Sequence, residues 1–170
     1  YDNNLLCIAE KEVFVVDSVF DSLMNAMERA GAARLNSQEI DRLTSAAMIQ
    51  VGEDNHDAPS KECLGQDAAK LAQFAGRQVP AGTELVFGET DEHHPFVSVE
   101  QMMPFLPFVR CRNVDEAIQK AKHYEHGFRH TSIIHSHDVR NMTRMGRIMD
   151  TTLFVKNGPC MASLGLGGEG

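Results

Sequence analysis

The sequence lacks any apolar run approaching the roughly 20 residues that are needed to cross a bilayer. Its start shows no basic segment followed by an apolar one, as a signal peptide would. Positive charge is also scarce, because 16 Lys and Arg residues stand against 24 Asp and Glu residues, for a formal net charge of −8. Such a surplus of negative charge disfavours non-specific binding to nucleic acid or to anionic membranes. We therefore expect no nucleic acid and no membrane among the partners.

Cysteine is equally sparse, and no C-x-x-C pair occurs. A disulfide framework is typical of small exported chains, and this sequence shows no sign of export. We therefore expect reduced thiols in a cytoplasmic compartment. The four cysteines are Cys7, Cys63, Cys111 and Cys160.

The sequence does contain an alternation of short apolar runs with amphipathic segments of helical length. This order predicts βαβ units, and hence one α/β domain over residues 1–170 with a mainly parallel sheet and flanking helices. In such folds ligands bind outside the carboxyl ends of the strands or at the loops next to them. Strands are expected at residues 13–16, 33–35, 84–88, 105–112, 131–135 and 152–155; helices at 17–30, after Asn36, at 66–75, 113–124 and 138–149; loops at 51–65 and 89–95.

Three details of this assignment rest on single residues. Pro107 cannot donate to a sheet ladder, so its strand is expected to lie at an edge or to be entered by a turn. Val19 and Val139 are expected on the buried stripes of their helices, from their helical spacing.

Cys7 lies in a polar turn just before the strand at 13–16. A nucleophilic thiol needs solvent access and a fixed position, and a turn next to a buried strand can provide both. The alternative is a small buried hydrophobic residue, because free cysteines are commonly buried. The residues alone leave both interpretations open.

Five of the eight histidines fall between His123 and His137, but their spacing matches no zinc signature, so no metal site is expected. His130 differs from the others because it immediately precedes a predicted strand, as Cys7 does. Loops before parallel strands can lie on one edge of a sheet, so a Cys7–His130 pair is geometrically allowed.

Two further segments invite a ligand. Glu100 precedes the strand at 105, where its carboxylate could bind a ribose hydroxyl or simply be solvated. The glycine-rich segment 165–170 resembles a phosphate loop only superficially, because no helix follows it.

Four motifs occur in one order along the chain: Asn-Leu-Leu-Cys-Ile-Ala-Glu-Lys-Glu-Val at 4–13, Glu-Gln-Met-Met-Pro at 100–104, His-Thr at 130–131, and Phe-Val-Lys-Asn-Gly-Pro at 154–159 with the glycine-rich segment after it. Together they resemble the CoA-acylating aldehyde dehydrogenases of the aldehyde dehydrogenase superfamily. Within that family the resemblance is to the propionaldehyde dehydrogenases of propanediol-utilising microcompartments, with the acetaldehyde enzymes of ethanolamine utilisation as near relatives.

The resemblance implies that residues 1–170 form the catalytic domain, with the nucleotide-binding domain outside this chain, and that the cofactors are NAD and coenzyme A. Cys7 matches the nucleophile that forms a thioacyl intermediate. His130 matches the histidine that activates or positions the coenzyme A thiol. Glu100 matches the residue that holds the nicotinamide ribose, and Met102 replaces an aromatic residue near the nicotinamide.

The resemblance further implies a short aldehyde substrate such as propionaldehyde, a homo-oligomeric full-length protein and residence in a bacterial microcompartment among shell or cargo proteins. The chain by itself is expected to be inactive. Two other hypotheses remain open from the residues: a non-redox Cys/His acyltransferase or hydrolase, and a non-catalytic α/β interaction module.

Overall fold

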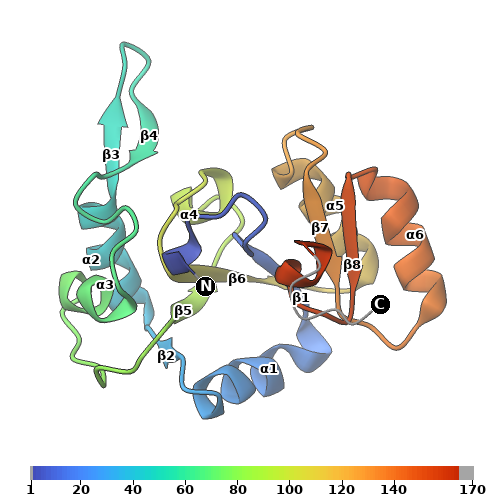
Figure 1. Cartoon of the computed structure of the whole chain (residues 1–170), viewed down its shortest axis with the longest axis horizontal. Coiled ribbons are helices and arrows are strands. Elements are labelled where there is room, and N and C mark those ends of the chain that lie inside the picture. The colour runs from blue at the N-terminus through green and yellow to red at the C-terminus, as the bar shows by residue number, and fades with distance from the viewer. Residues whose placement is uncertain (1, 165–170) are drawn as a thin grey trace.

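The computed structural model describes residues 2–164, and its centre is a four-stranded parallel sheet (Figure 1). The strand order is β1-β6-β5-β2, and all three neighbouring pairs are parallel. This arrangement confirms the predicted α/β fold with a mainly parallel sheet. The bounds are β1 Val13–Val16, β2 Ala33–Arg34, β5 Val86–Thr90 and β6 Phe105–Cys111.

Two smaller sheets accompany the central one. Strands β7 (Thr131–Ile134) and β8 (Leu153–Lys156) are parallel to each other, and β3 (Met48–Val51) and β4 (His56–Pro59) form an antiparallel hairpin that projects from the molecule (Figure 1). The prediction of a loop over residues 51–65 is wrong for the hairpin. Its residues are exposed or half-exposed apart from the first, so the sequence carries no alternation of apolar and polar side chains.

Strand β6 lies between β1 and β5, so the prediction of an edge strand is wrong. Pro107 pairs with Gly88 of β5, but β1 joins β6 only from Phe108 onward. The proline therefore sits just before that ladder begins, where a missing N–H is tolerated. β6 is also buried on both faces, which explains its continuous apolar sequence.

Helices cover the sheet. Asn36 and Glu39 form the predicted capping box at the start of α2, with hydrogen bonds of 2.8 and 3.0 Å. In α1 the buried residues are Phe20 and Met24, and the predicted Leu23 packs beside them, but Val19 is 52% exposed, so the prediction is wrong for Val19. The helices are α1 Asp17–Arg29, α2 Ser37–Ala47, α3 Ala68–Phe74, α4 Pro95–Ser98, α5 Val114–Tyr124 and α6 Val139–Met149, with short 3-10 helices at Asp2–Asn4 (η1) and Cys160–Leu164 (η2).

The core has one cluster on each side of β6. Leu43 of α2, Leu71 of α3 and Phe105 belong to one cluster. Phe20 of α1 packs in the other with Phe108, whose ring meets that of its neighbour on β5 edge-on at 5.5 Å. These two clusters pack helices against both faces of the central sheet.

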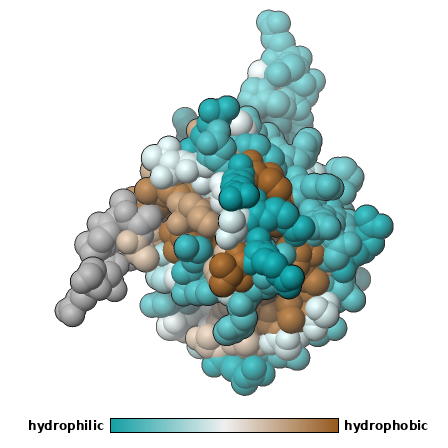
Figure 2. Space-filling model, turned by 90° about the vertical axis from the view of Figure 1, so that its right-hand side faces the viewer, coloured by the Kyte–Doolittle hydropathy of each residue, from teal (hydrophilic) through white to brown (hydrophobic). Residues whose placement is uncertain are grey.

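The outer face of α6 is mixed in character. Figure 2 shows apolar patches among hydrophilic ones on this side of the molecule. Val139, which we expected to be buried, is 68% exposed, and an open groove of about 490 Å3 follows the helix. None of the helices between residues 2 and 164 is long and apolar enough to cross a membrane. The groove is lined by Val139, Arg140, Thr143, Arg144, Arg147 and Ile148.

Candidate active site

Cys7 lies in a turn ahead of β1 that is closed by a hydrogen bond from the Ala9 N–H to the Leu6 carbonyl oxygen (3.0 Å). Its side chain is exposed, whereas the other three cysteines are buried. Of the four thiols, Cys7 is therefore the one that a substrate can reach. Burial also raises the pKa of the other three thiols, those of Cys63, Cys111 and Cys160.

Three successive residues before this turn have left-handed backbone conformations: Asp2 (φ 48°), Asn3 (φ 46°) and Asn4 (φ 64°). Asp and Asn are the residues besides glycine that tolerate this region best. Asn4 is buried, and its side-chain amide donates a hydrogen bond to the Met103 carbonyl oxygen (3.0 Å). The Cys7 segment is thus anchored to the loop that precedes β6.

Gln101 makes the second link between these segments. It is fully buried, and its side-chain nitrogen donates to the carbonyl oxygens of Lys11 (2.7 Å) and Phe105 (3.2 Å). The amide therefore ties the entrance of β1 to the start of β6. Its own oxygen has no hydrogen-bond partner among the described residues, so the two donated bonds alone set the orientation of the side chain.

Glu100 lies at the same edge of the sheet. The Lys11 ammonium donates to the Asn4 carbonyl oxygen (2.6 Å) and lies 3.4 Å from one Glu100 carboxylate oxygen. The Glu100 side chain is 53% exposed. Lys11 thereby joins the Cys7 segment to Glu100 electrostatically, although the pair is too exposed to add much stability.

Met102 is half-buried in the same loop. Its backbone is left-handed (φ 46°), and its carbonyl oxygen accepts a hydrogen bond from the Gly65 N–H (3.0 Å). The sequence-derived candidates Cys7, Glu100 and Met102 therefore lie in two loops that the hydrogen bonds of Asn4 and Gln101 hold together. Both loops lie at the end of the central sheet where the parallel strands begin, which we call its amino edge.

Glu12 adds an unusual carboxyl group to this edge. Burial raises its pKa from 4.5 to about 7; the nearby Lys11 charge opposes the shift and the Glu100 charge adds to it. At neutral pH the Glu12 carboxyl is consequently divided between its protonated and charged forms. The region thus contains one group that titrates in the physiological range.

His130 does not lie at the edge of the sheet that carries Cys7, although the sequence had allowed this position. It precedes β7, which belongs to the separate β7–β8 sheet, and no hydrogen bond links it to Cys7 within residues 2–164. Its backbone N–H donates to Glu125 (3.2 Å), and its Nδ1 lies 2.6 Å from the Thr131 hydroxyl. The Nε2 atom has no partner among the described residues, so one ring nitrogen is oriented and the other is available. The same residues contain no cluster that could hold a metal ion.

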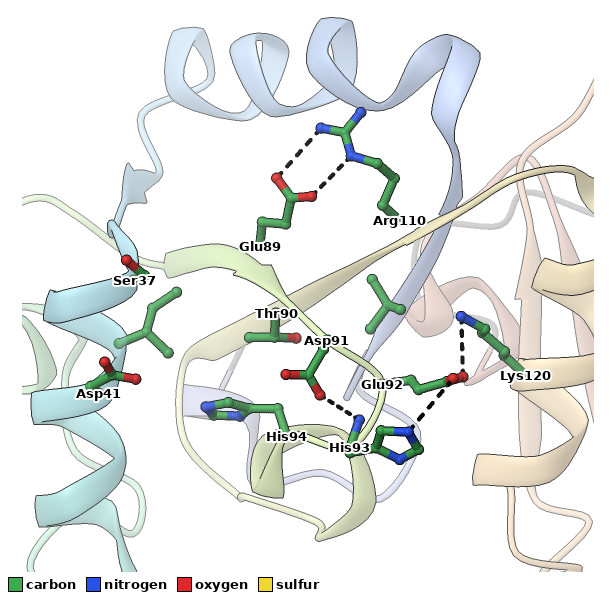
Figure 3. Close-up of a pocket in the computed structure, with 12 residues that line it drawn as sticks. Ser37, Asp41, Glu89, Thr90, Asp91, Glu92, His93, His94, Arg110 and Lys120 are labelled. Carbon is green, nitrogen blue, oxygen red and sulfur yellow. Dashed lines mark hydrogen bonds and ion pairs between the residues drawn. The ribbon is translucent and has the colours of Figure 1, made fainter.

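An open cavity lies at the opposite, carboxyl edge of the sheet (Figure 3). It measures about 540 Å3 and includes Glu92, which pairs with Lys120 (3.1 Å), and Arg110, which pairs with Glu89 (2.9 Å). None of the sequence-derived candidates lines it. The lining residues are Ser37, Ile40, Asp41, Glu89, Thr90, Asp91, Glu92, His93, His94, Val109, Arg110 and Lys120.

Three residues near the amino edge were not predicted from the sequence: Asn4, Gln101, and Glu10, which accepts a hydrogen bond from the Cys160 N–H. A run of Asp and Asn before a turn is a signal for left-handed backbone, and it could have identified Asn4. Glu10 and Gln101 gave no such signal, because their partners lie 150 and 90 residues away in the chain.

Comparison with known proteins places the whole chain in one family, although no family model matches it. The chain is 45% identical to the acetaldehyde dehydrogenase (acetylating) of Salmonella typhimurium over 170 residues and 40% identical to the propanal dehydrogenase (CoA-propanoylating) of Citrobacter freundii over 171. In both cases the match covers 100% of this chain and 36% of the relative.

Solved structures agree. The propionaldehyde dehydrogenase of Rhodopseudomonas palustris with bound propionyl-CoA superimposes with a TM-score of 0.90 at 40% identity, over 99% of this chain and 36% of that one. The propionaldehyde dehydrogenase from the fucose-utilisation microcompartment of Clostridium phytofermentans gives a TM-score of 0.90 at 37% identity, over 100% and 38%. The chain thus spans a little over a third of the length of its relatives, and it belongs to the family of CoA-acylating aldehyde dehydrogenases.

Proposed function

We propose that this chain is the cysteine-bearing catalytic region of an NAD-dependent enzyme that converts a short aldehyde and coenzyme A to acyl-CoA. The observation that carries the proposal is the accessible Cys7 thiol in a turn that is fixed to the Glu100 loop. Family membership supports it, because the relatives are acetaldehyde and propanal dehydrogenases that acylate CoA.

Cys7 would act as the nucleophile. Its thiolate forms a bond to the aldehyde carbon, and the carbonyl oxygen becomes an alkoxide. The backbone N–H of Cys7 donates no hydrogen bond among the described residues, so it is available to stabilise that developing charge. Loss of hydride from the thiohemiacetal carbon leaves a thioester on Cys7.

Glu100 and Met102 would form part of the cofactor site. The second carboxylate oxygen of Glu100 has no protein partner among residues 2–164, so it suits the hydroxyl groups of a ribose. Met102 offers a half-buried, adaptable apolar surface beside it. When bound, NAD would accept the hydride and coenzyme A would accept the acyl group.

His130 would take the proton from the attacking thiol of coenzyme A. In the tautomer whose Nδ1–H donates to the Thr131 hydroxyl, the Nε2 lone pair is available, which is the arrangement that a general base needs. Because no contact joins His130 to Cys7, its role would belong to acyl transfer rather than to activation of Cys7.

The microcompartment relative from Clostridium phytofermentans supports the further proposal that the enzyme resides in a bacterial microcompartment. Shell or cargo partners and self-association of the full-length protein stay predictions from the family resemblance. Relatives of both acetaldehyde and propanal type match this chain, so the proposed substrate class is a short aliphatic aldehyde.

The test uses the full-length enzyme, meaning this chain joined to the nucleotide-binding region that the proposal requires. Cys7→Ala should lower aldehyde- and CoA-dependent NADH formation by at least about 1,000-fold, since the covalent step is lost. Cys111→Ala, which removes a buried thiol, is the matched control and should remain active. Near-normal NADH formation by Cys7→Ala would refute the proposal.

His130→Ala tests the second role. Pre-steady-state kinetics should show a larger loss in acyl transfer to coenzyme A than in hydride transfer. Equal losses in both half-reactions would exclude a role specific to coenzyme A.

A further inference from the structure

Glu10 and Cys160 form a paired contact across 150 residues of chain. The Cys160 backbone N–H donates to one Glu10 carboxylate oxygen (3.0 Å), and the Cys160 thiol donates to the other (3.0 Å). Cys160 is 3% exposed. Burial, reinforced by the Glu10 carboxylate, raises the pKa of this thiol to about 11, so it remains protonated and able to donate at neutral pH. Both oxygens of Glu10 are therefore held by one residue.

Glu10 lies next to the turn that carries Cys7. Glu10 follows the turn that carries Cys7 by one residue, since that turn is closed by the hydrogen bond between Ala9 and Leu6. On the other side of Cys7, Asn4 is fixed to the loop before β6. The exposed thiol thus lies between two anchors, one on each side.

The two anchors reach different parts of the molecule. The bond of Asn4 leads to the central sheet, whereas Cys160 begins η2, which follows and contacts β8. β8 pairs with β7, and His130 immediately precedes β7. The Glu10–Cys160 contact therefore links the Cys7 turn, through η2, to the carboxyl end of the β7–β8 unit, and His130 lies at the opposite, amino end of that unit.

We propose that Glu10 is a positioning residue for Cys7: through its two bonds to Cys160, it fixes the turn that carries the thiol relative to the β7–β8 unit. This inference rests on the proposed function of Cys7. Glu10 bonds to Cys160 rather than to reacting atoms, so it acts only through the placement of the turn. A displacement of about 1 Å at a nucleophile can cost on the order of 100-fold in rate.

The experiment compares four variants in the full-length enzyme. Glu10→Ala removes both bonds and should lower kcat by about 10- to 100-fold with KM values for aldehyde, NAD and coenzyme A within about twofold. Glu10→Gln keeps a carbonyl oxygen for the Cys160 N–H and should lie in between. Cys160→Ser keeps both donors and should stay within about threefold of the native rate. Glu53→Ala, at the exposed tip of the β3–β4 hairpin, is the matched control.

Thiol labelling distinguishes a misplaced Cys7 thiol from one that has lost its chemical reactivity. Iodoacetamide should modify Cys7 in folded Glu10→Ala within about threefold of the native rate, because the thiol remains exposed while its target geometry is lost. If Glu10→Ala does not fold, Glu10→Gln and Cys160→Ala, which each remove one bond, carry the same test through kcat.

Each outcome bears on the inference. An unchanged kcat in the folded Glu10 variants, or a loss confined to KM or to the melting temperature, would overturn the positioning role. Cys7→Ala, assayed in parallel, keeps the two proposals apart. If Cys7→Ala is inactive and Glu10→Ala is normal, only the positioning role fails; if Cys7→Ala is active, the proposed function itself fails.

Discussion

The two edges of the central sheet are held in different ways. At the amino edge, the buried side chains Asn4 and Gln101 donate hydrogen bonds to backbone carbonyl oxygens and leave one thiol exposed above them. At the carboxyl edge, Arg110 and Lys120 hold carboxylates around an open cavity; the partners of Arg110 are exposed, and the Lys120–Glu92 pair is half-buried. Buried hydrogen bonds fix geometry because their loss leaves a polar group without water, whereas exposed ion pairs exchange readily with solvent.

This contrast favours the amino edge as the place for chemistry, although the cavity of about 540 Å3 lies at the carboxyl edge. A nucleophile needs a defined position more than it needs a large hollow within this chain. The following four predictions test the contrast, from the largest expected effect to the smallest.

The largest expected effect is the difference in reactivity between the Cys7 thiol and the three buried thiols. Iodoacetamide at mildly alkaline pH should modify Cys7 at least about 100-fold faster than Cys63, Cys111 or Cys160, because these three are buried and their pKa values are raised. Peptide mapping by mass spectrometry measures the rates, and urea-unfolded protein, in which all four should react alike, is the control. Comparable rates in the folded protein would show that the Cys7 turn is not specially accessible.

The buried hydrogen bond of Asn4 should be the strongest single anchor. Asn4→Ala should lower the free energy of unfolding by about 1–3 kcal/mol more than Asp2→Ala, since the Met103 carbonyl oxygen is left without its donor. Asp2 is the control because it has the same left-handed backbone but an exposed side chain, whereas the Asn3 side chain itself donates to the Gly65 carbonyl oxygen. Urea denaturation gives both values, and equal losses would mean that backbone conformation, not the buried bond, is what matters.

Glu12 should make the amino edge sensitive to pH. The pKa of Glu12 is about 7 in the folded protein and near 4.5 when unfolded, so between these pH values the folded state binds more protons than the unfolded one. Its contribution to stability therefore falls as pH rises through this window. Glu12→Gln removes the cost of burying a charged carboxylate. The melting temperature of this variant, compared with that of the native protein, should therefore be more favourable at about pH 8 than at about pH 5.

The control for this prediction is Glu28→Gln on the exposed side of α1, whose effect should be the same at both pH values. A Glu12→Gln effect that does not vary with pH would contradict the raised pKa of this carboxyl.

Arg110 should show the smallest effect. It contacts Glu89, Asp17 and Asp21, and these partners raise its pKa, but the network is exposed. Arg110→Gln should lower the melting temperature by less than Asn4→Ala does. Added salt should make the loss caused by Arg110→Gln smaller still, because salt screens exposed ion pairs. Calorimetry at low and high ionic strength measures this. An Arg110 effect that exceeds that of Asn4 and persists in salt would reverse the comparison of the edges.

Local sequence signals foretold most elements. The apolar run at 13–16 formed β1, and Asn36 with Glu39 capped α2 as expected, because both signals act within a few residues. The β3–β4 hairpin escaped notice because its strands are exposed on both faces. Pro107 misled the assignment of β6, since whether a proline is tolerated depends on where the neighbouring strand begins.

The candidate site divides in the same way. Four motifs in one order carried the family resemblance, and that resemblance predicted the roles of Cys7, Glu100 and Met102. That the loops carrying these residues share one edge depends on β1 and β6 being adjacent and parallel, which is a matter of strand order. The assignment to the glycine-rich segment 165–170 lies outside the described residues, and the roles of Cys7, His130, Glu100 and Met102 stay predictions.

The sequence by itself determined the α/β class, the family and the polar turn that carries Cys7, because periodicity, capping and motif are properties of short stretches of chain. Tertiary structure alone decided that β6 is central, that His130 belongs to a different sheet from Cys7, and that Glu10 is held by Cys160. These facts depend on contacts between residues far apart in the chain, and such contacts are set by how the sheets and helices pack rather than by any local pattern.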